Sequence, residues 1–197
     1  MKEENFTPEQ SLQVIQVMID KAKNQFSENG HLYLLWGWVV LICSVSEFIL
    51  LKFVEYEKHY LVWMFTWLAV IYQIMYLAKR KRKEKLKTYA DSMVGFVWLT
   101  FIVTMGLMVF ILAHGQPPYY KLINPVFLAL YAIPTILSGV ILRFRSLIIG
   151  GISCWLLAIL SNFIPYEYQL LLVSAAMIIA WIIPGYLLRV KYKQQKS

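Results

Sequence analysis

The sequence predicts an all-α protein, an integral membrane six-helix bundle preceded by an N-terminal amphipathic helix. Three observations support this prediction. Hydrophobic residues make up 59% of the 197 residues, whereas a soluble domain averages about 45–50%. They gather in six runs, each close to the ~20 residues that cross a hydrocarbon core ~30 Å thick as a helix. A basic block, KRKRKEKLK at residues 79–87, separates two of these runs.

The chain divides into three parts. Residues 1–30 are the N-terminal amphipathic helix, residues 31–190 the six-span transmembrane bundle, and residues 191–197 a basic C-terminal tail. Continuous apolar runs are typical of spanning helices, whereas the strands of a membrane barrel would show alternation.

The N-terminal part carries its own helix signals. Thr7 can cap the helix, and Pro8 suits its first position. Apolar side chains recur at helical spacing as far as Phe26, and Asn29-Gly30 is a plausible stop. One interpretation is a helix that packs on the cytoplasmic loops or lies in the membrane interface. The other is a helix that binds a protein partner or a second copy of the chain.

The six spans are predicted from the apolar runs alone. Their approximate limits are residues 32–53, 60–78, 93–113, 122–142, 146–164 and 167–188. Pro134 lies inside the fourth span, and Pro184-Gly185 lies near the end of the sixth, where each can bend its helix.

Basic residues predict the orientation of these spans. If residues 1–30 are inside, sixteen of the nineteen Lys and Arg residues fall on that side. Only Lys52, Lys58 and Lys121 remain on the other. The positive-inside rule therefore predicts a multi-pass membrane protein with both termini in the cytoplasm.

Soluble-enzyme motifs are absent from the sequence. It contains no G-x-x-x-x-G-K, H-E-x-x-H or G-x-S-x-G pattern and no paired-cysteine metal motif. We therefore expect no catalytic residues, no metal and no cofactor. Both cysteines, Cys43 and Cys154, lie inside apolar runs, which implies no disulfide framework. The three histidines lie near span ends, where we expect no catalytic role.

Glu47 is the one acid well inside a predicted span. It lies roughly 7–8 Å from the membrane midplane, at ~1.5 Å of rise per residue. An acid at that depth is costly unless it is protonated, paired or hydrated. Side chains that share its face or lie near its depth form a candidate intramembrane polar site with it: Ser44, Ser161, Asn162 and Thr66. The alternatives are hydrogen bonds that only hold the bundle together, or a tilted span that lets Glu47 reach the interface.

The basic block has two interpretations. It is either only a topology signal or also a contact surface for anionic lipids, since each basic residue near such a surface contributes on the order of 1 kcal/mol. The candidate lipid contacts are Lys79, Arg80, Lys81, Arg82, Lys83, Lys85 and Lys87. Nucleic acid is not an expected partner, because the block is short and tethered to the bilayer.

The opening TPEQSLQVIQVMIDKAKNQFSENG, followed by YLLWGWVV, resembles a group of uncharacterised small multi-span bacterial membrane proteins. They share an amphipathic N-terminal segment, an E-N-G-like stop and a Trp-Gly-Trp-like first span. The similarity is specific over about residues 8–40 and implies that the protein lies in the bacterial cytoplasmic (inner) membrane. Such proteins are often encoded near winged-helix regulators, which implies a role in envelope regulation, and the resemblance implies no catalytic residue.

These patterns favour a non-enzymatic membrane module that binds a partner or senses the envelope. The alternative is a small transporter or channel that uses Glu47 and an outer-leaflet polar cluster. A membrane-embedded enzyme is favoured least, because no two acids, and no acid and histidine, are expected at one depth inside the spans.

Overall fold

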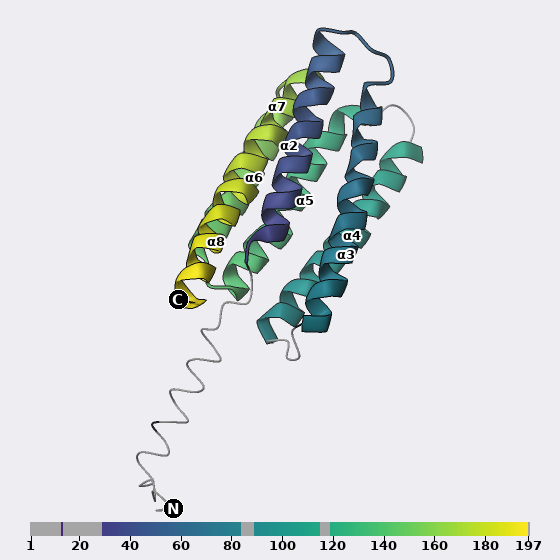
Figure 1. Cartoon of the computed structure of the whole chain (residues 1–197). Helices are drawn as coiled ribbons and strands as arrows, with labels where there is room; N and C mark the ends of the chain where they lie inside the picture. Colours follow the sequence, from purple (N-terminus) through teal and green to yellow (C-terminus); the bar gives the residue numbers. More distant parts are fainter. Residues whose placement is uncertain (1–12, 14–28, 84–88, 115–118, 197) are drawn as a thin grey trace, which may run out of the picture.

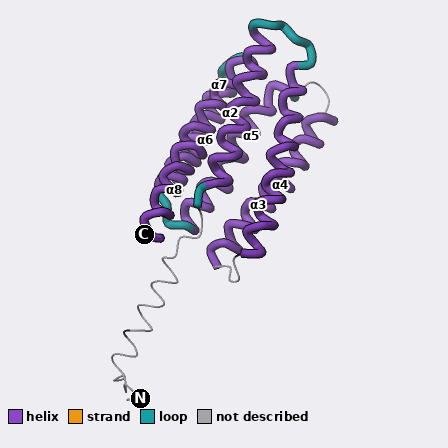
Figure 2. Tube along the Cα trace, viewed as in Figure 1, coloured by secondary structure: helices purple, strands orange, loops and turns teal. Residues whose placement is uncertain are grey.

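The computed structural model describes residue 13 and residues 29–83, 89–114 and 119–196. Apart from Gln13, the expected N-terminal amphipathic helix falls outside these residues. Every regular element of the described chain is helical, which confirms the all-α prediction (Figure 2).

The described elements form six helical rods that run along one axis (Figure 1). The 3₁₀ helix η1 continues directly into α3, and the π-helix η2 joins α7 to α8. The bounds are α2 (His31–Lys52), η1 (His59–Phe65), α3 (Thr66–Lys83), α4 (Tyr89–His114), α5 (Tyr120–Ile141), α6 (Arg145–Ser161), α7 (Tyr166–Met177), η2 (Ile178–Ile182) and α8 (Ile183–Lys196).

Five of the rods are long and apolar enough to cross a membrane. The sixth, α6, is apolar but has 17 residues, so it is shorter than the predicted span 146–164. Extended backbone at Phe144 precedes it, and the turn before Pro165 follows it. A residue before proline is disfavoured in helical conformation, which explains why the helix ends early.

The rods alternate in direction, so their connections gather at two ends (Figure 1). We call one end, with residues 53–58 and 162–165, the Glu47 end. The other, where α3 and α8 finish and α4 and α6 begin, is the basic end. The basic block is helical where it is described, because Lys79–Lys83 continue α3, as the good helix propensity of Lys and Arg allows. The tail from residue 191 likewise continues α8 to Lys196.

Close helix contacts organise the core around η2. An ideal Cβ on Gly150 of α6 would lie 2.6 Å from the Ala180 Cα, and one on Gly37 of α2 would lie 2.8 Å from the Ile182 Cγ1. Pro184 explains the π-helix, because its ring would collide with the carbonyl four residues earlier in a regular helix. Trp181 in η2 donates to the Thr135 hydroxyl of α5 at 2.9 Å.

The rods differ in how much of their surface the described chain covers. Between 33% and 56% of the apolar window is buried in α2, in α5 and in the α7–η2–α8 rod. Only 6% is buried in the η1–α3 rod and in α4. The α3 helix packs on α2, whereas α4 packs on α5 and inserts Trp98 between Tyr33 and Trp181. Apolar side chains such as Trp67, Ile71 and Phe110 therefore remain exposed.

Candidate functional site

Glu47 is buried near the end of α2, where its side chain is only 2% exposed. It faces η1 and α7 rather than the outside of the bundle, as the sequence analysis required of a site residue. Three side chains contact its two carboxylate oxygens: His59, Trp63 and Tyr166. We call these four residues the Glu47 cluster.

Both oxygens of Glu47 accept hydrogen bonds. The Trp63 indole donates Nε1–H to Oε2 at 2.6 Å, and the Tyr166 hydroxyl donates to Oε1 at 3.4 Å. The Nδ1 atom of His59 lies 2.8 Å from the same Oε1. A buried carboxylate is costly unless it is paired and hydrogen-bonded, and these contacts satisfy that requirement. The cluster therefore joins α2, η1 and α7 through one acid.

The local backbone explains how His59 and Trp63 reach Glu47. After α2 the chain reverses direction through residues 53–58, where Glu55 has a positive φ of 53° and the Tyr56 amide donates to the Leu50 carbonyl at 3.0 Å. His59 and Trp63 then lie one turn apart on η1. The element buries none of its residues fully, so contacts to Glu47 are a large part of what holds it. The Cys43 thiol adds a weak bond to the Val62 carbonyl at 3.6 Å.

Ser44 belongs to a neighbouring polar group one turn before Glu47. Its hydroxyl donates to the Leu170 carbonyl at 2.5 Å, and the Ser174 hydroxyl lies 3.2 Å from it. Both serines are buried and join α2 to α7. Ser44 thus shares the buried face of α2 with Glu47, as predicted, but no bond joins the two side chains within the described network.

The other predicted site residues do not contact Glu47: two form hydrogen bonds elsewhere, and one is exposed. The Thr66 hydroxyl donates to the Trp63 carbonyl in its own helical rod at 2.5 Å. Ser161 donates to the Ala158 carbonyl, and its own carbonyl accepts from the Gln169 amide at 3.0 Å. Asn162 is exposed. The structure therefore brings Glu47 and Ser44 to one buried face and leaves Ser161, Asn162 and Thr66 out of the Glu47 cluster.

Sequence reasoning missed His59, Trp63 and Tyr166. We expected no acid and histidine at one depth, and the contact between Glu47 and His59 shows that this expectation is wrong. A signal was present in the sequence: twelve residues separate the two, across the first predicted turn. A turn that short brings the end of one span beside the start of the next.

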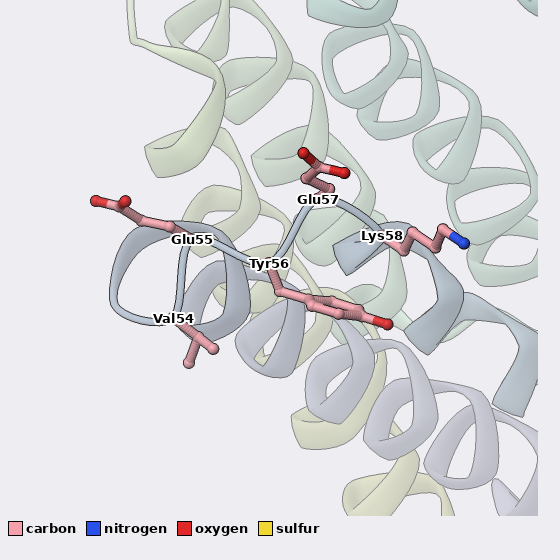
Figure 3. Close-up of a pocket in the computed structure, with 5 residues that line it drawn as sticks. All are labelled: Val54, Glu55, Tyr56, Glu57 and Lys58. Carbon is pink, nitrogen blue, oxygen red and sulfur yellow. The ribbon is translucent and has the colours of Figure 1, made fainter.

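Neither of two surface pockets is lined by Glu47. The first, of about 420 Å³, is an open depression lined by residues 54–58. In Figure 3 the charged ends of Glu55, Glu57 and Lys58 point away from one another, so they do not form a joint binding site. The second, of about 400 Å³, lies between α5 and α6 and includes Asn162. Within the described ranges, no three His, Cys, Asp or Glu residues are grouped to hold a metal ion.

The described part of the basic block, residues 79–83, lies at the basic end together with further cations. Lys79 is exposed, and Lys81–Lys83 are described only as part of α3, while Lys85 and Lys87 lie outside the described residues. Cations from the α5–α6 turn and from α8 lie at the same end: Arg143, Arg145, Arg189, Lys191 and Lys193.

A second polar junction joins α2 to α3 at the basic end. The Asn29 amide donates to the Tyr76 hydroxyl at 2.8 Å, and the His31 Nε2 atom lies 3.0 Å from the Tyr72 hydroxyl. One turn further along α2, the Trp36 indole donates to the Gln73 side-chain oxygen at 2.6 Å. Polar contacts therefore join the α2 and η1–α3 rods near both ends.

No protein-family model, curated protein or solved structure matches this chain.

Proposed function

We propose that the chain is a non-enzymatic integral membrane module of the bacterial inner membrane, which senses the envelope or binds a partner protein. The observation that carries the proposal is the Glu47 cluster. Both oxygens of its buried acid are already bonded to side chains of the chain itself, and they join three elements. Such an arrangement can hold or change the position of elements without binding a substrate.

The surface of the bundle supports membrane insertion. Five rods have the length and composition of spanning helices, and their exposed side chains are largely apolar. Apolar surface of this extent suits a bilayer, because a soluble monomer rarely exposes contiguous apolar patches of more than a few hundred Å². The sparsely covered α3 and α4 offer the largest faces to lipid or to a partner helix.

The two ends support the proposed orientation. Cations from α3, the α5–α6 turn and α8 lie at the basic end, whereas the described residues of the Glu47 end include only Lys52, Lys58 and Lys121. By the positive-inside rule the basic end is cytoplasmic and can contact anionic lipids there. Both termini then lie in the cytoplasm, and the Glu47 cluster lies near the outer surface.

Cysteine labelling tests the topology. In a background in which the buried Cys43 and Cys154 are replaced by Ala, we introduce Asn162→Cys or Gln194→Cys, both at exposed positions. An impermeant thiol reagent should label Asn162→Cys in intact cells and Gln194→Cys only after the cells are opened. Labelling of both positions from the same side would contradict the six-span orientation.

A small transporter that uses Glu47 is the alternative outcome. The lining of neither pocket includes Glu47, which weighs against it. Ion flux through proteoliposomes that depends on Glu47 would favour the transporter over the module.

A further inference from the structure

We propose that Glu47 and His59 together form a proton-binding site, and that proton uptake by His59 fixes η1 against α2 and α7. The inference rests on the proposed function, which it deepens by naming the proton as the signal that the module senses. The argument uses the exposure of the two side chains, their hydrogen bond and the way η1 is attached.

The two groups differ in their exposure. Glu47 is 2% exposed, whereas the His59 side chain is 19% exposed and directly follows the exposed turn of residues 53–58. That turn carries the charges of Glu55, Glu57 and Lys58, which require water, so a proton can reach the imidazole from the turn without a channel. The Nδ1 atom faces the carboxylate at 2.8 Å. An imidazole is the side chain whose charge ordinarily changes between about pH 5 and about pH 8.

Proton uptake leaves the hydrogen bonds in place and changes only the charge. Neutral His59 with its hydrogen on Nδ1 donates to Oε1 of the Glu47 carboxylate, so the pair carries one negative charge. One proton added at Nε2 gives an imidazolium–carboxylate pair of zero net charge. Trp63 and Tyr166 donate to the carboxylate in both states. Protonation adds a positive charge 2.8 Å from the carboxylate, and the attraction between the two charges holds η1 more tightly in the protonated state.

Other ionisable groups surround the pair without replacing it. Within the described chain, Glu47 is the only acid hydrogen-bonded to His59. The Lys52 ammonium lies over the Tyr168 ring, 5.6 Å from its centre, and the Tyr60 ring packs on His59 at 6.0 Å between centres. Besides His31 and Tyr33 at the other end of α2, the ionisable groups on the surrounding elements are Cys43 and Lys52 on α2, Glu55, Tyr56, Glu57 and Lys58 in the turn, Tyr60 on η1, and Tyr166, Glu167 and Tyr168 on α7.

The way η1 is attached to the bundle determines which element responds when His59 takes up a proton. This element has no fully buried residue and continues without interruption into α3, whose apolar window is hardly covered by the bundle. The bond from His59 to Glu47 therefore contributes to how firmly the start of α3 is held, beside the Trp63 bond to the same carboxylate. The far end of α3 carries the basic block, so the site is joined by one helical rod to the other end of the molecule.

The test uses the full-length chain in detergent micelles and measures heat resistance between about pH 5 and about pH 8, the range in which an unperturbed imidazole titrates. His59→Asn keeps an amide donor near the Nδ1 position but cannot titrate in this range, and Glu47→Gln keeps the shape but not the charge. His114→Asn is the matched control, because His114 is exposed and bonds only to the Phe110 carbonyl of its own helix. Histidine NMR signals, with His59 assigned by its absence in His59→Asn, follow the proton directly.

We expect the unfolding temperature of the wild type to fall as the pH rises through the titration of His59. Because the protonated pair is the more stable one, its contribution is present at acid pH and lost at alkaline pH. The fall should disappear in His59→Asn and in Glu47→Gln and persist in His114→Asn. An equal fall in all four proteins, or no fall in the wild type, would overturn the proposal, and His59→Asn decides alone if Glu47→Gln does not fold.

Proteoliposomes separate this proposal from the proposed function. Changing only the external pH should shift the His59 signal in molecules whose basic end lies inside the vesicle. If the His59 signal responds to pH and to Glu47→Gln, but cysteine labelling places the Glu47 end on the cytoplasmic side, the proton site stands and envelope sensing fails. If the orientation is as proposed but His59 does not respond to Glu47→Gln, the proton site fails alone.

Discussion

Replacement of Gly150 by Ala should destabilise the bundle, whereas the same change at Gly106 should not. An ideal Cβ on Gly150 would lie 2.6 Å from the Ala180 Cα and 3.2 Å from the Ile179 carbonyl oxygen. Carbon atoms prefer separations of about 3.5–4.0 Å, so α6 and η2 must move apart by roughly 1 Å. The obstructing atoms belong to the backbone, which cannot rotate away as the end of a side chain can.

The magnitude follows from the comparison of the two glycines. Each change from Gly to Ala gains about 1 kcal/mol of helix propensity, and this gain cancels in the difference. Overpacking at Gly150 costs about 1–3 kcal/mol, while a Cβ on Gly106 would meet no atom within 4 Å. Gly150→Ala should therefore be less stable than Gly106→Ala by about 1–3 kcal/mol.

The assay is unfolding of the purified full-length variants in detergent, followed by circular dichroism. Gly37→Ala provides an intermediate case, since its nearest obstacle is the Ile182 Cγ1 at 2.8 Å, a side-chain atom that can shift. We expect stability to decrease in the order Gly106→Ala, Gly37→Ala, Gly150→Ala. Equal stability of the three variants, or a Gly150→Ala variant more stable than wild type, would refute the close packing of α6 on η2.

Two further predictions concern the two ends of the molecule. Glu47→Leu should lower the free energy of unfolding by about 1–3 kcal/mol, because the Trp63 N–H loses its acceptor. Glu47→Gln should lower it less, since the amide oxygen of Gln can still accept from Trp63. Equal losses of the two variants in denaturant titrations would contradict this prediction. The second change replaces four cations of the basic block with Gln: Lys81, Arg82, Lys83 and Lys85. Binding to anionic liposomes should weaken by on the order of 4 kcal/mol and depend less on salt. An unchanged lipid preference would mean that the block is only a topology signal. The control replaces Lys52, Lys58 and Lys121 with Gln, because this change removes positive charge from the Glu47 end instead of the basic end.

Hydropathy predicted the helical rods well, because long continuous apolar runs leave few alternatives to helices. It could not predict η1. The stretch HYLVWMF is as apolar as the helix after it, and its 3₁₀ form coincides with the bonds from His59 and Trp63 to Glu47, which involve a different helix. Tertiary contacts of this kind leave no signal in hydropathy, although the short turn before His59 does bring it near the end of α2.

Sequence reasoning also identified Glu47 but not its partners. Counting residues along a helix gives depth, whereas a contact also requires that two side chains face each other. Ser161 and Asn162 were assigned a depth similar to that of Glu47, yet one bonds within its own helix and the other is exposed. Trp63 and Tyr166 carry no signal in the sequence, because aromatic residues are common at the ends of membrane helices, whether or not they bond to an acid.

The way in which the η1–α3 rod is attached indicates which part of the fold moves most readily. The rods α2, α6 and α7–η2–α8 are interlocked at glycines, so separating them would expose tightly packed surface. The η1–α3 rod, by contrast, has only 6% of its apolar window buried. It is attached to α2 through Glu47 at one end and through Tyr72, Gln73 and Tyr76 at the other. Each of these bonds contributes about 0.5–1.5 kcal/mol. A change at Glu47 therefore acts on one of the two rods with the least packing to oppose a movement, which is what the proposed sensing module requires.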